Sequence, residues 1–240
     1  VSGLEALLDA GATGVVLTAG GRLAEIAAER NLPLVHIPAA REGDGFQPRC
    51  ATGYVVTYLA RILSAAGVLD GPEADLRALP SFLRGLQVRE EAEDVARWFG
   101  ERLPVIYTDE RHLAAVARIT KIKLNEHAKR PAFFNALPEA NHNETIGFSA
   151  AHGQFALLYL HDPASHPRIQ QRFDVMRRVF TERGMDHMDL RQWTMPGQST
   201  LEKIFAAQTF GEWCAYTCAL LAEIDPTPVP LVESFKKALV

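Results

Sequence analysis

Short apolar runs alternate with longer segments of helical periodicity along most of the chain, and no other feature limits the possible folds as strongly. In the first half, apolar runs at 14–18 and 34–37 flank a helical pattern at 22–30. The second half repeats the alternation, with helical patterns at 110–129 and 167–183 and with apolar runs at 105–107, 132–137, 155–160 and 188–193. Strands that alternate with helices form parallel sheets covered by helices. The sequence therefore predicts an α/β fold.

Two such α/β units follow one another along the chain. We place their boundary near residue 103, because Pro104 begins a new apolar run after the amphipathic segment 88–102. Residues 1–103 then form a first domain and 104–240 a second. Further helices are expected at 49–66, 201–224 and 231–239, whereas the segment 67–85, which proline and glycine interrupt, is assigned no helix or strand.

Two of these expected helices, 49–66 and 201–224, are unusually apolar. They carry more hydrophobic surface than a half-domain can cover, and exposed apolar patches of that kind usually mark interfaces. The opening VSGLEALLDAG already has the pattern of a helix interior, so the chain is expected to begin within a domain.

Composition excludes several classes of protein. The chain has 240 residues, 48% of them hydrophobic, which is enough to bury one or two cores. Its formal net charge is -4, with 25 Lys and Arg against 29 Asp and Glu and no basic block, so no nucleic-acid partner is expected. No signal-peptide pattern or 18-residue apolar span is present, and the three cysteines do not follow a secreted spacing. We expect a cytoplasmic protein without membrane contact, whose partners are small molecules or protein.

The segment 124–148 concentrates polar side chains between two apolar elements. Glu126 lies near the end of an expected helix whose other face is apolar, where a carboxylate suits a general base. The alternative is a solvated helix-end glutamate, and residue type alone favours it. His142 follows Pro138 in the run PEANHNE, which is expected to be a loop, and a loop histidine can move protons near neutral pH.

Other reactive side chains carry weaker signals. His161, Asp162 and His166 match no zinc spacing, so no metal site is expected. Cys214 and Cys218 share one face of an apolar helix and are expected to be small core residues. An unrelated α/β oxidoreductase is discounted because no strand is followed by a GxGxxG turn and a helix.

Five motifs taken together resemble one family. They occur in the family's order and cover essentially the whole chain: LTAGGRLAEIA at 17–27, QPR at 47–49, LNEHAK at 124–129, LPEANHNE at 137–144 and the terminal DPTPVPLVESFKKAL. On these motifs the chain resembles the bifunctional phosphoglucose/phosphomannose isomerases, which are members of the sugar isomerase (SIS) domain superfamily.

The resemblance implies a fold, an activity and a set of site residues. It implies two SIS-type domains, each a flavodoxin-like parallel sheet flanked by helices, and a homodimer whose active sites are shared between subunits. It implies interconversion of glucose 6-phosphate or mannose 6-phosphate with fructose 6-phosphate, without cofactor or metal. Glu126 then resembles the base that moves a proton between C2 and C1, and His142 the partner-supplied histidine of ring opening. Lys236 resembles a lysine that joins in ring opening, and Arg49 the arginine that steadies the enediolate.

Two departures from the family pattern bear on substrate binding. The family's glycine-rich turn and Ser/Thr-rich loop, which hold the substrate phosphate, are expected upstream of Val1, so the first domain is expected to be incomplete. Val229 stands where the family is expected to carry a threonine that makes room for both sugar epimers, which leaves the choice between glucose and mannose open. The alternative function is a non-catalytic SIS protein that binds a sugar phosphate as a sensor.

Overall fold

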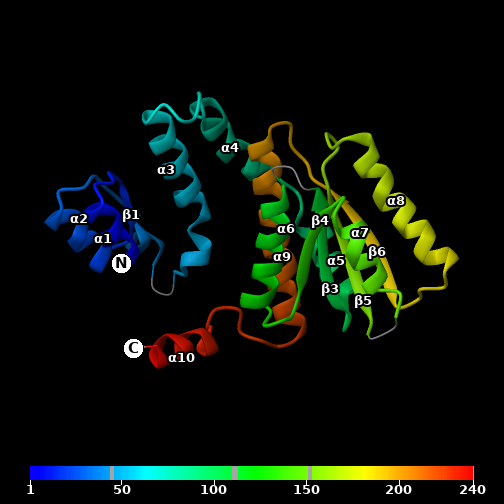
Figure 1. Ribbon diagram of the computed structural model, residues 1–240. Helices are drawn as coiled ribbons and strands as arrows, with labels where there is room; N and C mark the ends of the chain where they lie inside the picture. The colour runs from blue at the N-terminus through cyan, green and yellow to red at the C-terminus, as the bar shows by residue number, and fades with distance from the viewer. Residues whose placement is uncertain (44–45, 110–112, 151–152, 240) are drawn as a thin grey trace. The chain divides into compact units, whose positions relative to one another are not determined.

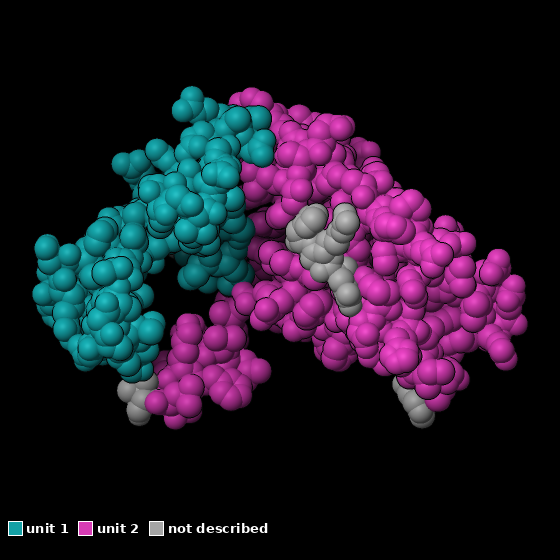
Figure 2. Space-filling view, turned by 45° about the horizontal axis from the view of Figure 1, so that its top comes forward, with its two compact units in different colours: residues 1–78 teal, residues 79–240 magenta. Residues whose placement is uncertain are grey.

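The computed structural model describes residues 1–43, 46–109, 113–150 and 153–239 of the chain. Helices and strands alternate along it, and the chain divides into two compact units, Val1–Ala78 and Leu79–Val240 (Figures 1 and 2). This division precedes the boundary expected near residue 103, because α5 (Arg89–Phe99) packs against α9 (Thr200–Leu221) of the second unit. No helix in the described part of the chain is long and apolar enough to cross a membrane.

The first unit contains a small parallel βαβ arrangement, as the sequence predicts. It begins with α1 (Ser2–Asp9), and β1 (Val16–Thr18) pairs in parallel with β2 (Leu34–His36) through the connecting helix α2 (Arg22–Glu29). Two short 3₁₀ turns, η1 (Ala39–Glu42) and η2 (Pro48–Cys50), lead to α3 (Thr52–Ala65). No residue of α3 is fully buried, and Val55 and Leu59 are exposed, so part of its apolar surface remains uncovered within the described chain.

The second unit is built on a four-stranded parallel sheet of order β4-β3-β5-β6. The strands are β3 (Leu103–Asp109), β4 (Phe133–Leu137), β5 (Phe155–His161) and β6 (Met188–Thr194). Side chains alternate between the two faces of each strand. Ile106 and Leu158 therefore face a core that includes α5, α6 (Ala114–Glu126) and α9. Tyr107 and Tyr159 face another core with α7 (Ala140–Gly147) and α8 (Pro167–Glu182).

Helix α9 is the central helix of this unit. Twelve of its residues are buried, and it packs against both α5 and α6. A helix that is apolar on all sides belongs in a core. The expectation that 201–224 forms an exposed interface is therefore wrong for most of its length, although Tyr216, Leu220 and Leu221 near its end are exposed.

Two further helices differ from expectation. The helix α4 (Glu73–Gly85) forms in a segment to which the sequence assigned no element, with Pro80 inside it and Leu79 buried. The run around His142, expected to be a loop, is the helix α7. The chain ends in α10 (Pro230–Ala238), close to the predicted bounds.

Candidate functional site

Glu126 is the last residue of α6 and lies at the rim of the second unit's core. Leu124 is fully buried, whereas Glu126 is half-buried, so the helix is anchored on its apolar face and presents the carboxylate at its end. Asn125, within α6, donates its side-chain amide to the Arg130 carbonyl at 2.8 Å. This hydrogen bond holds the turn that follows the helix. The apolar pattern of α6 thus places Glu126 at a defined point near the start of β4.

Lys129 joins this helix end to a distant segment. Its ammonium lies 2.9 and 3.3 Å from the carbonyls of Glu126 and His127, and 3.0 and 3.1 Å from those of Asp225 and Pro226. The first two carbonyls belong to the α6 C-terminus, where backbone acceptors lack intrahelical partners and a cation is favourable. The last two precede α10. Lys129 therefore ties the end that carries Glu126 to the chain leading into α10.

A cavity of about 430 Å³ lies between the parts that Lys129 joins. Its walls come from the end of α6, the turn before β4 and the start of α10, and its lining residues are Asn125, Glu126, Lys129, Arg130, Pro131, Val229, Pro230, Leu231 and Val232. The structure thus brings together Glu126 and Val229, two of the residues that the sequence singles out. A carboxylate beside apolar side chains can accept a carbon-bound proton.

His142 lies far from this cavity. It is an exposed residue of α7, which follows the carboxyl end of β4, whereas Glu126 precedes the amino end of the same strand. β4 has five residues, and at a rise of about 3.3 Å per residue its ends are roughly 13 Å apart. In addition, α6 and α7 cover opposite faces of the sheet. One chain therefore cannot place both groups on the same small molecule.

The remaining two sequence-based candidates lie outside the cavity lining. Lys236 is exposed on α10, and its ammonium pairs with Glu233 at 2.7 Å. Arg49 belongs to the first unit, where it is half-buried in η2 and donates to the Gln47 side chain at 3.1 Å. Neither position tests the role that the resemblance implies.

The histidines and acids considered for a metal do not form a metal site. Asp162 binds the Lys203 ammonium at 2.6 Å; burial opposes ionisation, but this hydrogen bond contributes to a lowered pKa of the Asp162 carboxyl. The ring Nδ1 of His166 accepts the Arg168 amide at 3.2 Å and caps α8. Within the described ranges, no group of three or more His, Cys, Asp or Glu side chains could hold an ion.

Cys214 and Cys218 are buried in the core around α9, as predicted. Burial raises the pKa of both thiols, so neither is a ready nucleophile.

The role of Lys129 can be tested without any assay of activity. Replacing Lys129 by Met removes the cation that joins α6 to residues 225–226. Because hydrogen bonds from a charged donor hold these segments, amide exchange in α10 should become at least about tenfold faster. Lys121→Met, within α6, is the control and should leave that exchange unchanged. Equal exchange in the Lys129→Met variant and the unaltered protein, measured by mass spectrometry, would show that other contacts fix α10.

Comparison with known proteins shows which proteins the chain is similar to. Residues 88–239 match the model described as "Bacterial phospho-glucose isomerase C-terminal SIS domain". The chain is 28% identical to the bifunctional phosphoglucose/phosphomannose isomerase of Aquifex aeolicus, covering 100% of this chain and 71% of that protein. It is 35% identical to the D-glucosamine-6-phosphate 4-epimerase of Sulfolobus acidocaldarius, over only 58% of this chain and 43% of that protein.

A solved structure shares the fold. The glucose-6-phosphate isomerase like protein from Thermus thermophilus superposes with a TM-score of 0.62 at 22% identity, covering 94% of this chain and 78% of that one.

Proposed function

Because the chain belongs to the family of bacterial phospho-glucose isomerase C-terminal SIS domains, we propose that it is an enzyme that interconverts the aldose and ketose forms of a phosphorylated hexose. The proposed reaction converts glucose 6-phosphate, mannose 6-phosphate or both to fructose 6-phosphate. The observation that carries the proposal is the position of Glu126, in the motif LNEHAK, at the rim of a cavity of about 430 Å³.

The proposed mechanism is a proton transfer through a cis-enediol. The Glu126 carboxylate takes the proton from C2 of the open-chain aldose, and the electrons of the broken C–H bond form the C1–C2 double bond. The C1–O1 π electrons move to O1, which takes up one proton to match the one that O2 loses afterwards. The proton held by Glu126 then returns to C1, O2 loses its proton and the ketose forms. Atoms and electrons balance within the sugar, so the step needs no redox cofactor. The proposed role of Arg49 is to stabilise the enediolate oxygen.

Ring opening precedes this step and has its own residues in the proposal. His142 of the partner subunit and Lys236 would exchange protons with the ring oxygen and the C1 hydroxyl. The separation of Glu126 and His142 on opposite faces of the sheet supports a site shared by two chains. The uncovered apolar surface of α3 supports the proposed homodimer as well.

We further propose that the chain carries parts of two SIS-type domains, and we assign α5, which lies before the boundary expected near residue 103, to the second of them because it packs against α9. The parallel pair of β1 and β2 around α2 supports the first domain. The four-stranded parallel sheet supports the second.

The competing function is a sensor that binds a hexose phosphate without converting it. An assay of fructose 6-phosphate formation from each aldose, alongside binding measured by calorimetry, separates the two functions. Glucosamine 6-phosphate is tested as well, with its C4 epimer as the product measured, because one relative is named as its 4-epimerase. Binding without turnover of any of the three sugars would establish the sensor in place of the enzyme.

Chelation tests the metal-free character of the proposed mechanism. A carboxylate base with cationic donors requires no Lewis acid, so turnover should stay within about twofold after treatment with EDTA. The rate of fructose 6-phosphate formation before and after chelation measures this. Loss of activity that added zinc restores would assign the reaction to a metal-dependent mechanism.

A further inference from the structure

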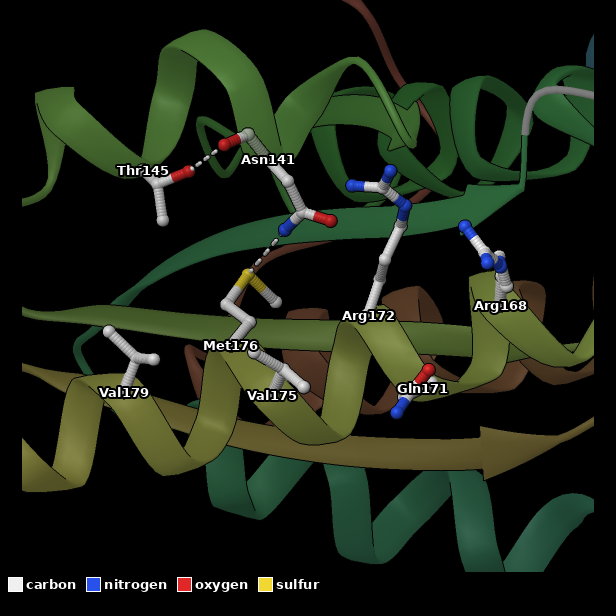
Figure 3. Close-up of a pocket in the computed structure, with 8 residues that line it drawn as sticks. All are labelled: Asn141, Thr145, Arg168, Gln171, Arg172, Val175, Met176 and Val179. Atoms are coloured by element: carbon white, nitrogen blue, oxygen red, sulfur yellow. Dashed lines mark hydrogen bonds between the residues drawn. The ribbon is translucent and has the colours of Figure 1, made fainter.

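A second cavity, of about 400 Å³, opens between α7 and α8 on the other face of the sheet from α6 (Figure 3). It takes no part in the proposed isomerisation. Its residues are Asn141, Thr145, Arg168, Gln171, Arg172, Val175, Met176 and Val179. One end is cationic and the other is apolar, because the arginines precede the valines along α8 (Figure 3).

Among the residues that the structure describes, the cationic end has no acid to balance it. Arg168 and Arg172 lie four residues apart on α8, so they share one face of the helix, and Figure 3 shows both side chains directed toward the side of α7. In the described part of the chain, the structure records no ion pair for either one. Further along the same helix, Arg177 pairs with Asp174 at 2.9 Å and Arg178 with Glu182 at 3.8 Å. None of the residues named above as lining the cavity is acidic.

The α7 wall contributes an unused polar atom. The side-chain oxygen of Asn141 is buried and receives no hydrogen bond from any described residue. Its amide nitrogen contacts the Met176 sulfur at 3.4 Å, and sulfur is a weak acceptor. Figure 3 shows this amide on the side of the cavity that Arg172 reaches. Buried amide groups normally have partners, so the Asn141 oxygen can accept a hydrogen bond from a hydroxyl of a ligand.

We propose that this cavity binds a small phosphate monoester. Arginine forks match the geometry of phosphate oxygens, and two of them on successive turns can hold one dianion from the same side. The Asn141 amide would bind the polar remainder of the ligand, and Val175 and Val179 would contact its carbon skeleton. The helix α7 also carries His142, which the proposed function places in the shared active site. A ligand in this cavity would therefore hold α7, and with it His142, in a fixed position.

Arginine footprinting tests the assignment on the unaltered protein, with no reference to isomerase activity. Phenylglyoxal modification is mapped by mass spectrometry with inorganic phosphate, glucose 6-phosphate or no ligand present. We expect phosphate to slow modification of Arg168 and Arg172 at least about tenfold, while Arg177 and Arg178 on the same helix change less than about twofold. Stronger protection by glucose 6-phosphate would identify a sugar phosphate as the ligand. The proposal would be overturned if neither ligand slowed modification of Arg168 and Arg172, or if all four arginines were slowed by the same factor.

A variant separates this cavity from phosphate bound elsewhere. In the unaltered protein, phosphate should slow amide exchange in α7 by at least about threefold, because both walls of the cavity become tied together. The double variant Arg168→Gln, Arg172→Gln should lose this effect, and Arg177→Gln should keep it. Slowing that persists in the double variant would place the phosphate outside this cavity. Isomerase turnover is measured separately, so failure here leaves the proposed reaction standing.

Discussion

Replacing Glu126 by Gln is expected to lower turnover at least about a hundredfold, which is the usual scale for loss of a general base. Gln keeps the size and shape of the side chain but cannot accept the C2 proton. The cavity between α6 and α10 should therefore keep its walls, and KM should change less than about threefold while kcat falls. The measurement is the rate of fructose 6-phosphate formation over a range of substrate concentrations.

The matched control for this prediction is Glu182→Gln. Glu182 is a carboxylate at the end of a helix, as Glu126 is, but it lies at the end of α8 and pairs with Arg178 across an exposed surface. Its replacement should leave both kinetic constants unchanged. Near-normal turnover in Glu126→Gln would remove Glu126 from the mechanism and leave the cavity without its proposed base.

The second unit's fold could be predicted because its strands are short, apolar and separated by helices. All four strands of its sheet coincide with apolar runs in the sequence. The helix α7 was missed because PEANHNE has few apolar residues. Tertiary contacts hold it instead: Ala140 is buried, and Glu144 accepts hydrogen bonds from Tyr107 and from Asn135, both on neighbouring strands. Such contacts override local propensity and cannot be seen in a single sequence.

In the helix α4 as well, tertiary contacts override a local signal, here one against a helix. Its Pro80 indicates a break, because proline removes a helical hydrogen bond. The helix nevertheless continues through Pro80; Leu79 is buried, and Phe82 and Leu86 pack against the core of the second unit. The burial of these side chains offsets the local cost of the proline.

The candidate site could be predicted only in part. The motif LNEHAK drew attention to Glu126, and the same motif contains Lys129, but nothing local indicates that this lysine reaches residues nearly a hundred positions away. That long-range contact joins the two segments that line the cavity near Glu126. The arginines of α8 carry no motif either; they become notable only when the structure leaves them facing a cavity whose described lining holds no acid.

The sequence also could not show which of the two apolar helices remains exposed. Both 49–66 and 201–224 are apolar, yet α9 finds cover on most sides within its own unit and α3 does not. Apolar content alone cannot separate a central core helix from an interface helix, because that depends on how many neighbours pack around it.

In the proposed active site, Glu126 and His142 act on one sugar from two different chains. This arrangement is tested most directly by mixing two inactive variants, Glu126→Gln and His142→Ala, through joint unfolding and refolding. Each heterodimer would contain one site with both groups intact. Random pairing makes about half of the dimers mixed, so activity should recover to roughly a quarter of that of the unaltered protein.

The control is each variant refolded alone, which should stay inactive. Native mass spectrometry of the mixture establishes that heterodimers are present before the rate of fructose 6-phosphate formation is measured. Recovery near a quarter is the result that a shared site predicts. No recovery in a sample that contains heterodimers would contradict the account, because Glu126 and His142 would then have to act within one chain or one of them would have no part in the reaction.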